Sequence, residues 1–78
     1  MAKLKLIWDF RGPASQKIAE HHLVHLKEYV KLKNLTIPAS GTEKISEIHH
    51  TAYIVCNEKD MPPLRDSLKP HRGQLYHG

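Results

Sequence analysis

The fold depends first on residues 3–33, which read KLKLIWDFRGPASQKIAEHHLVHLKEYVKLK. Residues 3–10 alternate between apolar and polar side chains with the exception of Ile7, and this period of two predicts a strand with one buried face. Gly12-Pro13 ends the strand. From there apolar residues recur at steps of three and four, which predicts a helix over 14–33 that Asn34 can end in a left-handed conformation. The buried face of the strand would comprise Leu4, Leu6, Trp8 and Phe10.

A second alternating stretch follows a turn-rich segment and ends at Cys56. We interpret residues 44–56 as one long strand, with residues 35–38 as a short partner strand across the turn. A bulge within 42–50 would instead divide the stretch into two strands. The sequence therefore leaves residues 35–47 open between one strand, two strands and a loop.

Prolines divide the C-terminal part of the chain. Pro62-Pro63 suits the first turn of a helix and no helix interior, so we predict a short helix that runs to about Lys69. Pro70 ends this helix, and residues 74–77 are a candidate edge strand.

The order of predicted elements is β-α-(β)-β-α-(β), in a chain of 78 residues that has room for a single domain over 1–78. The simplest packing is an α+β two-layer sandwich with both helices on one face of the sheet. This order resembles the ferredoxin-like plait, or a shortened version of it, and the dimeric α+β barrel proteins that pair two such sheets. The resemblance implies a fold and no function.

Charge and cysteine content indicate the environment of the protein. The chain carries 12 basic and 8 acidic residues, a formal net charge of +4, together with 7 histidines. This modest positive charge permits an anionic partner and is too small to indicate nucleic acid by itself. Cys56 is the sole cysteine, so no intrachain disulfide can form, and charged residues interrupt the apolar N-terminal run. We therefore expect a cytoplasmic protein with no membrane partner.

A candidate ligand site follows if the two long strands are parallel neighbours. Each strand leads into a helix, so both helix N-termini would emerge at the same edge of the sheet. Backbone amides and the helix dipole at such positions attract anions, and an arginine adds charged hydrogen bonds. We predict a site for an anionic small ligand formed by Arg11, Gly12, Ser15, Asn57 and Lys59.

The outer face of the predicted sheet is too apolar for a solvated surface. A second copy of the chain is the commonest cover for such a face, and we predict a homodimer through it. Rival covers are a peptide, a small ligand and stacked RNA bases, but the face offers one tyrosine and no glycine–aromatic signature, which disfavours nucleic acid. The interface residues would be Ile7, His49, Thr51, Tyr53 and Val55.

Histidines are the residues best suited to chemistry. His21 and His25 lie one helical turn apart, but a closed zinc site needs four ligands, and the zinc-protease helix needs glutamate where His22 stands. We therefore predict no metal and no cofactor, with His22 packed in neutral form against the sheet and its pKa lowered by burial. Cys56, at the inner end of a strand, is expected to be a buried small hydrophobe.

No motif in the chain specifies a reaction, so the biochemical function stays open. The sequence favours a non-enzymatic, self-associating domain that binds a partner or an anionic small ligand. One alternative is a small dimeric α+β-barrel-type enzyme that uses His22 or His49 with Tyr53, in a site between sheet and helices. Another is an RNA-binding or histidine-rich metal-binding module. A concave apolar cavity with converging polar groups would favour the enzyme, and a filled sheet would favour the binding domain.

Overall fold

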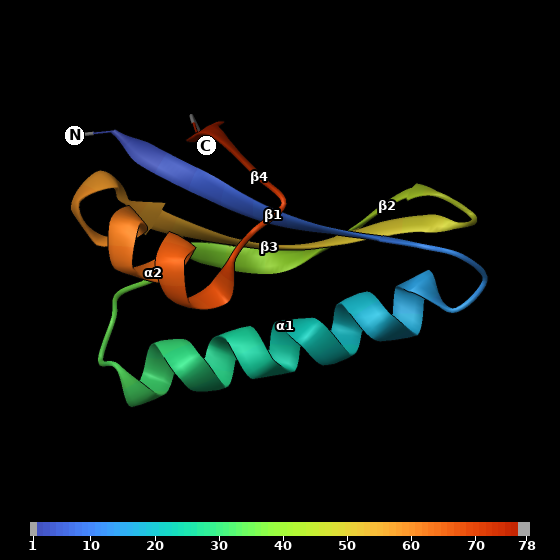
Figure 1. Ribbon diagram of the computed structural model, residues 1–78, viewed down its shortest axis with the longest axis horizontal. Helices are drawn as coiled ribbons and strands as arrows, with labels where there is room; N and C mark the ends of the chain where they lie inside the picture. Colours follow the sequence, from blue (N-terminus) through green and yellow to red (C-terminus); the bar gives the residue numbers. More distant parts are fainter. Residues whose placement is uncertain (1, 77–78) are drawn as a thin grey trace.

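The computed structural model describes residues 2–76 and contains a four-stranded antiparallel sheet with two helices. In the spatial order β2-β3-β1-β4, the strands are β2 (Ala39–Ser46), β3 (His49–Asn57), β1 (Lys3–Arg11) and β4 (Arg72–Tyr76). The helices are α1 (Ser15–Leu32) and α2 (Met61–Leu68), and a short 3-10 turn precedes α2 at Glu58–Asp60. Figure 1 shows both helices on the same face of the sheet, so the expected α+β class is confirmed. Neither helix in this part of the chain is long and apolar enough to cross a membrane.

The helix boundaries follow the signals in the sequence. Asn34, just beyond α1, has a φ of 56°, which is the left-handed conformation expected of it. The N–H of Leu35 donates to the carbonyl of Val30 (3.0 Å) and closes the helix end. α2 carries both prolines in its first turn and ends before Lys69, which is also left-handed with a φ of 49°. Both helices therefore match the prediction closely.

The prediction of one long strand over residues 44–56 is wrong. β2 and β3 form a hairpin instead, in which Ser46 pairs with His49 and Glu47-Ile48 makes the turn. The register of the hairpin shifts just before Ser46, which is a bulge, so the alternative of two strands divided within 42–50 agrees with the structure. The physical reason is that Glu47-Ile48 contains none of the glycine, asparagine or aspartate that usually marks a two-residue turn, so the two strands look like one.

This hairpin reverses the expected direction of β3. The strand that follows α1 is β2, which lies at the edge of the sheet, and β3 returns between β2 and β1. β3 is therefore antiparallel to β1, with Arg11 opposite His49 and Lys3 opposite Asn57. The assumption of two parallel neighbouring strands is wrong, and residues 35–38 belong to the loop before β2.

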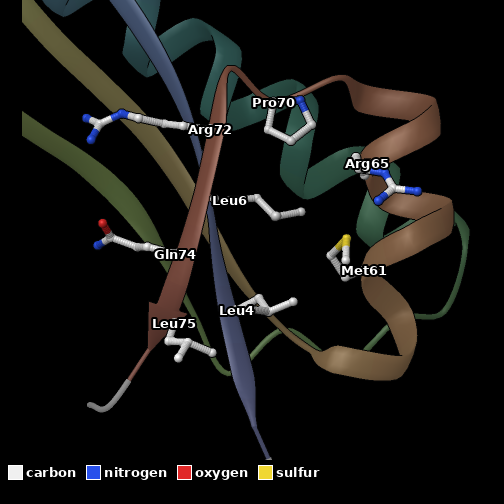
Figure 2. A pocket seen from close by; sticks show the side chains of 9 residues that line it. Leu4, Leu6, Met61, Arg65, Pro70, Arg72, Gln74 and Leu75 are labelled. Atoms are coloured by element: carbon white, nitrogen blue, oxygen red, sulfur yellow. The ribbon is translucent and has the colours of Figure 1, made fainter.

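β4 forms the other edge of the sheet and pairs with one end of β1. Its residues Gly73 and Leu75 lie opposite Leu6 and Leu4, on the face that the helices cover. Figure 2 shows β4 alongside β1, with α2 next to the two strands. The prediction of an edge strand over 74–77 is confirmed in part, since the strand begins earlier and residue 77 lies outside the described residues.

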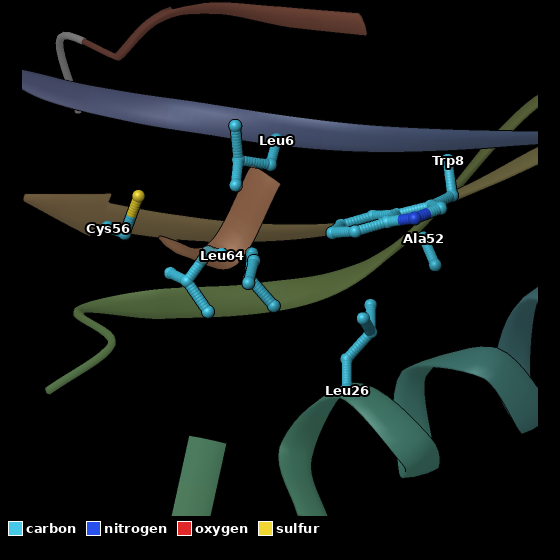
Figure 3. Close-up of a cluster of buried hydrophobic side chains, with 7 residues drawn as sticks. Leu6, Trp8, Leu26, Ala52, Cys56 and Leu64 are labelled. Atoms are coloured by element: carbon cyan, nitrogen blue, oxygen red, sulfur yellow. The ribbon is translucent and has the colours of Figure 1, made fainter. Parts of the chain in front are cut away.

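The core fills the space between the sheet and the two helices (Figure 3). The indole N–H of Trp8 donates to the backbone carbonyl of Leu68 (2.9 Å), so a buried polar atom is satisfied and β1 is tied to the end of α2. Each fully buried aliphatic side chain contributes about 1.5–3 kcal/mol to stability. The buried cluster consists of Leu6, Trp8, Leu26, Ala52, Ile54, Cys56 and Leu64.

Candidate functional site

An apolar groove lies between α2 and β4. Its volume is about 460 Å³, within the range of about 300–1,000 Å³ that is usual for small-ligand pockets. Leu4 and Leu6 of β1 and Met61 of α2 form the floor, and Figure 2 shows their side chains between the strands and the helix. Pro70 lines one end of the groove and Leu75 the other. The groove is thus a preformed apolar surface at the edge of the sheet.

The groove exists because of the side chains that β4 presents to the helix face. At Gly73 there is no side chain, and a Cβ added there would stand 3.4 Å from Cδ2 of Leu6. The next residue on that face, Leu75, is 60% exposed and does not pack down onto the core. The short helix α2 covers the core through Leu64 but leaves the space above Gly73 open.

Two arginines line the mouth of the groove, and they differ in orientation. The guanidinium of Arg72 turns to the outer face of the sheet, where it donates to both carboxylate oxygens of Asp9 (3.0 and 3.1 Å). Figure 2 shows the Arg72 side chain directed away from α2. Arg65 on α2 is exposed and contacts the neighbouring Asp66 at 3.3 Å. Arg65 is therefore the cation available to an acidic group at this mouth.

The outer face of the sheet is covered by the chain's own long side chains. The ammonium of Lys5 lies 4.3 Å from the centre of the Tyr53 ring and 2.6 Å from a carboxylate oxygen of Glu43. The Tyr53 ring itself lies over Gly41, where an added Cβ would meet the phenol oxygen at 3.0 Å. These contacts form a polar layer above the apolar residues of the face.

This layer removes the argument for the predicted interface. Ile7, Thr51 and Val55 are at most 4% exposed without any partner chain, while His49 and Tyr53 are half-buried. The inference that another molecule must cover these residues is wrong, because Lys5, Tyr53 and the charged groups around them do so. A homodimer through this face stays a prediction, but it no longer has that support.

Asp9 is the centre of a charged network on the same face. Besides Arg72, its carboxylate accepts a hydrogen bond from Nε2 of His49 (2.8 Å). The hydrogen bonds from Arg72, more than the single one from His49, hold the pKa of Asp9 below its ordinary value against the opposing effect of burial. Arg11 lies at the border of this network, with its guanidinium 3.4 Å from Nδ1 of His49. Asp9, His49 and the two arginines thus serve as hydrogen-bond partners for one another. Among the contacts of the described residues, His49 is not paired with a nucleophile.

The predicted anion site does not form from its five residues. Because β1 and β3 are antiparallel, Arg11, Gly12 and Ser15 lie at one end of the sheet, and Asn57 and Lys59 lie at the other. The N–H of Gly12 is occupied by the carbonyl at position 48 (2.7 Å). Ser15 is fully buried and its Oγ is hydrogen bonded to Nδ1 of His50 (2.7 Å). The first group is therefore a structural junction between β1, α1 and β3.

The histidine and tyrosine of the enzyme alternative do not share a site. The ring of His22 packs on the helix side, with its centroid 5.3 Å from that of Trp8 and 5.2 Å from that of Phe10. Tyr53 and His49 lie on the outer face, separated by about 13 Å along the strand. The proposed combination of His22 or His49 with Tyr53 between sheet and helices is wrong in this geometry.

Half-buried His22 and fully buried Cys56 behave as the sequence predicts. Burial, followed by the charges of His25 and His71, lowers the pKa of His22, and its Nε2 has no hydrogen-bond partner among residues 2–76. Cys56 is fully buried, and burial, followed by the charge of Asp60, raises the pKa of its thiol. A raised thiol pKa suppresses the reactive thiolate, so Cys56 acts as a core residue.

Sequence reasoning missed the groove and the buried pair of Ser15 and His50. Gly73 and Leu75, two positions apart on an edge strand, are a signal for the groove that is visible in the sequence. The signal can be interpreted only when the register that pairs Gly73 with Leu6 is known.

No family model, no curated protein and no solved structure matches this chain.

Proposed function

We propose that this chain is a non-enzymatic assembly module, in which two copies join edge to edge through β4. The observation that carries this proposal is the juxtaposition of an edge strand, the exposed Leu75 and the apolar groove next to it. Self-association was also the function that the sequence favoured. The structure supports a different surface for it, since the outer sheet face is already covered.

The backbone of β4 is suited to pairing with another strand. β4 lies at the end of the sheet and bonds to β1 on one side, so its other side presents N–H and C=O groups to solvent among the described residues. Such an edge is a template for a further strand. Four of its five residues are exposed, which leaves this edge accessible.

The side chains of β4 favour one register for a symmetric pair. In an antiparallel pairing centred on Gln74, Leu75 of each copy lies opposite Gly73 of the other. Opposite residues of paired strands lie on the same face, so each Leu75 would extend over the position where Gly73 leaves space above Leu6. Burial of a leucine contributes about 1.5–3 kcal/mol, and the twofold symmetry repeats the contact.

We also infer that the fold is the ferredoxin-like plait. β1 and β2 are both antiparallel to β3, so they run parallel to each other with β3 between them. This split β-α-β arrangement supports the inference, as does the element order β-α-β-β-α-β. Face-to-face pairing of two sheets, as in the dimeric α+β barrel proteins, would bury the charges of Lys5, Glu43 and Asp9, which disfavours that assembly.

Arg65 favours a second function for the same groove. A monomer would leave an apolar pocket open with a guanidinium at its mouth, which suits a small molecule that has an apolar chain and a carboxylate. Binding of decanoate that is weakened in Arg65→Gln would support this function. Equal binding by both proteins, or none, would exclude it.

Light scattering after size exclusion tests the assembly directly. Wild type should elute with twice the monomer mass of 9.0 kDa, and Leu75→Asp should be monomeric because it places a charge against an apolar groove. Leu32→Asp is the matched control, since Leu32 is 79% exposed at the end of α1 and should leave the dimer intact. A monomeric wild type at high micromolar concentration, or a dimeric Leu75→Asp, would overturn the proposal.

A further inference from the structure

We propose that His21 and His25 bind one divalent transition-metal ion through their Nε2 atoms, with water in the remaining coordination positions. This inference does not depend on assembly through β4. The two residues face each other across one turn of α1, on its exposed side.

The spacing of the two imidazoles suits a metal. Their Nε2 atoms are 3.1 Å apart, and the ring planes meet at 70°. With metal–nitrogen bonds of about 2.0–2.1 Å, two ligands stand about 3.3 Å apart at a tetrahedral angle and about 2.9 Å apart at a right angle. The observed separation of 3.1 Å lies between these values, so the two nitrogens already have the spacing that one ion requires. In the metal-free chain the same distance suits an N–H···N hydrogen bond, which the ion would replace.

The surrounding structure holds the pair in place. Both histidines lie in the middle of α1, which is anchored to the sheet by the buried side chains of Ala19 and Leu26. A carboxylate oxygen of Glu28 lies 3.6 Å from Nδ1 of His25. This is beyond hydrogen-bond distance, but the negative charge on that side favours a proton on Nδ1, which leaves the lone pair of Nε2 for a metal.

The ligand type selects the class of ion. Neutral imidazole binds Cu²⁺, Ni²⁺ and Zn²⁺, whereas Mg²⁺ and Ca²⁺ require oxygen ligands. Within residues 2–76, no group of three or more His, Cys, Asp or Glu side chains is arranged to hold a metal. The site therefore has two protein ligands and open positions, and we expect Cu²⁺ to bind most tightly, followed by Ni²⁺ and Zn²⁺.

Calorimetric titration of the untagged chain with Ni²⁺ tests the site. We expect one ion per chain and no heat of binding with Mg²⁺. Loss of an outer partner alone weakens metal sites by about 10–100-fold, so His21→Gln or His25→Gln, which removes a ligand, should cost at least about tenfold.

A matched control keeps the number of histidines constant. The double variant His25→Gln, Lys27→His moves one imidazole to another exposed position of α1 and separates it from His21, so it should lose the site as His25→Gln does. His71→Gln removes a histidine outside the pair and should bind like wild type. The proposal fails if wild type binds neither Ni²⁺ nor Cu²⁺, or if His25→Gln and the double variant bind as tightly as wild type. Circular dichroism checks that each variant is folded.

Discussion

Gly73 of β4 pairs in register with Leu6 of β1, and a Cβ added at Gly73 would stand 3.4 Å from the Leu6 side chain. This contact distance is ordinary to slightly tight, so a Cβ at position 73 requires little or no movement of its neighbours. The strand could therefore form with a larger residue at position 73. Because this residue is glycine, it leaves space in the groove.

Gly73→Val should prevent dimer formation without lowering the stability of the monomer. Valine favours strand structure and would fill the space that we assign to Leu75 of the second copy. We expect a monomer by light scattering with a melting temperature no lower than that of the monomeric Leu75→Asp. Gln74→Val is the control, because it makes a similar gain in strand propensity on the opposite face and should leave the dimer intact. A dimeric Gly73→Val would contradict the proposed register.

The network at Asp9 should make stability depend on pH. The folded pKa of Asp9 is lowered, so its contribution is present above the unfolded pKa of about 3.9 and is lost as pH falls through the lower folded value. We expect Asp9→Asn to lose about 1 kcal/mol at pH 7, as for a well-formed surface ion pair. Urea unfolding at pH 7 and pH 3 should show a smaller loss on acidification in the variant than in wild type. An equal loss would exclude Asp9 as a source of acid sensitivity.

Local periodicity predicts the parts of this fold that depend on neighbouring residues. The alternation of β1, the apolar side of α1 and the proline signals of α2 are all visible in short windows of sequence. The division into β2 and β3 is only an alternative at the level of sequence, because the turn Glu47-Ile48 contains none of the glycine, asparagine or aspartate that usually marks a two-residue turn. Without this turn, β3 is predicted to run in the wrong direction. Arg11 and Asn57 are then expected at the same end of the sheet, whereas they lie at opposite ends.

The candidate sites depend on contacts between strands, which sequence alone does not provide. Val55 looks like an exposed apolar residue until register places Lys5 beside it, on the central strands of the sheet. The groove likewise depends on the pairing of Gly73 with Leu6, two residues far apart in the chain. By contrast, the pairing of His21 with His25 follows from helical spacing and could be predicted.

Ser15→Ala should destabilise the junction between α1 and β3. The hydroxyl of Ser15 is buried and bonded to Nδ1 of His50, and its removal leaves that nitrogen without its partner. We expect a loss of about 1–3 kcal/mol in the free energy of unfolding, measured with urea. Ser67→Ala, on the exposed side of α2, should change stability by less than about 0.5 kcal/mol. Equal effects of the two substitutions would show that the buried bond contributes nothing.

His22→Phe should stabilise the protein at pH 7.5. The His22 ring already packs against Trp8 and Phe10, and its buried Nε2 has no partner within the described residues, so phenylalanine would keep the aromatic contacts and remove an unsatisfied polar atom. We expect a gain of about 1 kcal/mol in the free energy of unfolding, measured with urea in the presence of EDTA so that bound metal does not contribute. His21→Phe, at an exposed position of α1, controls for the general effect of an added phenyl ring and should give no comparable gain. A loss of stability in His22→Phe would mean that Nε2 makes a hydrogen bond in solution, for example to water, and that this nitrogen stabilises the fold.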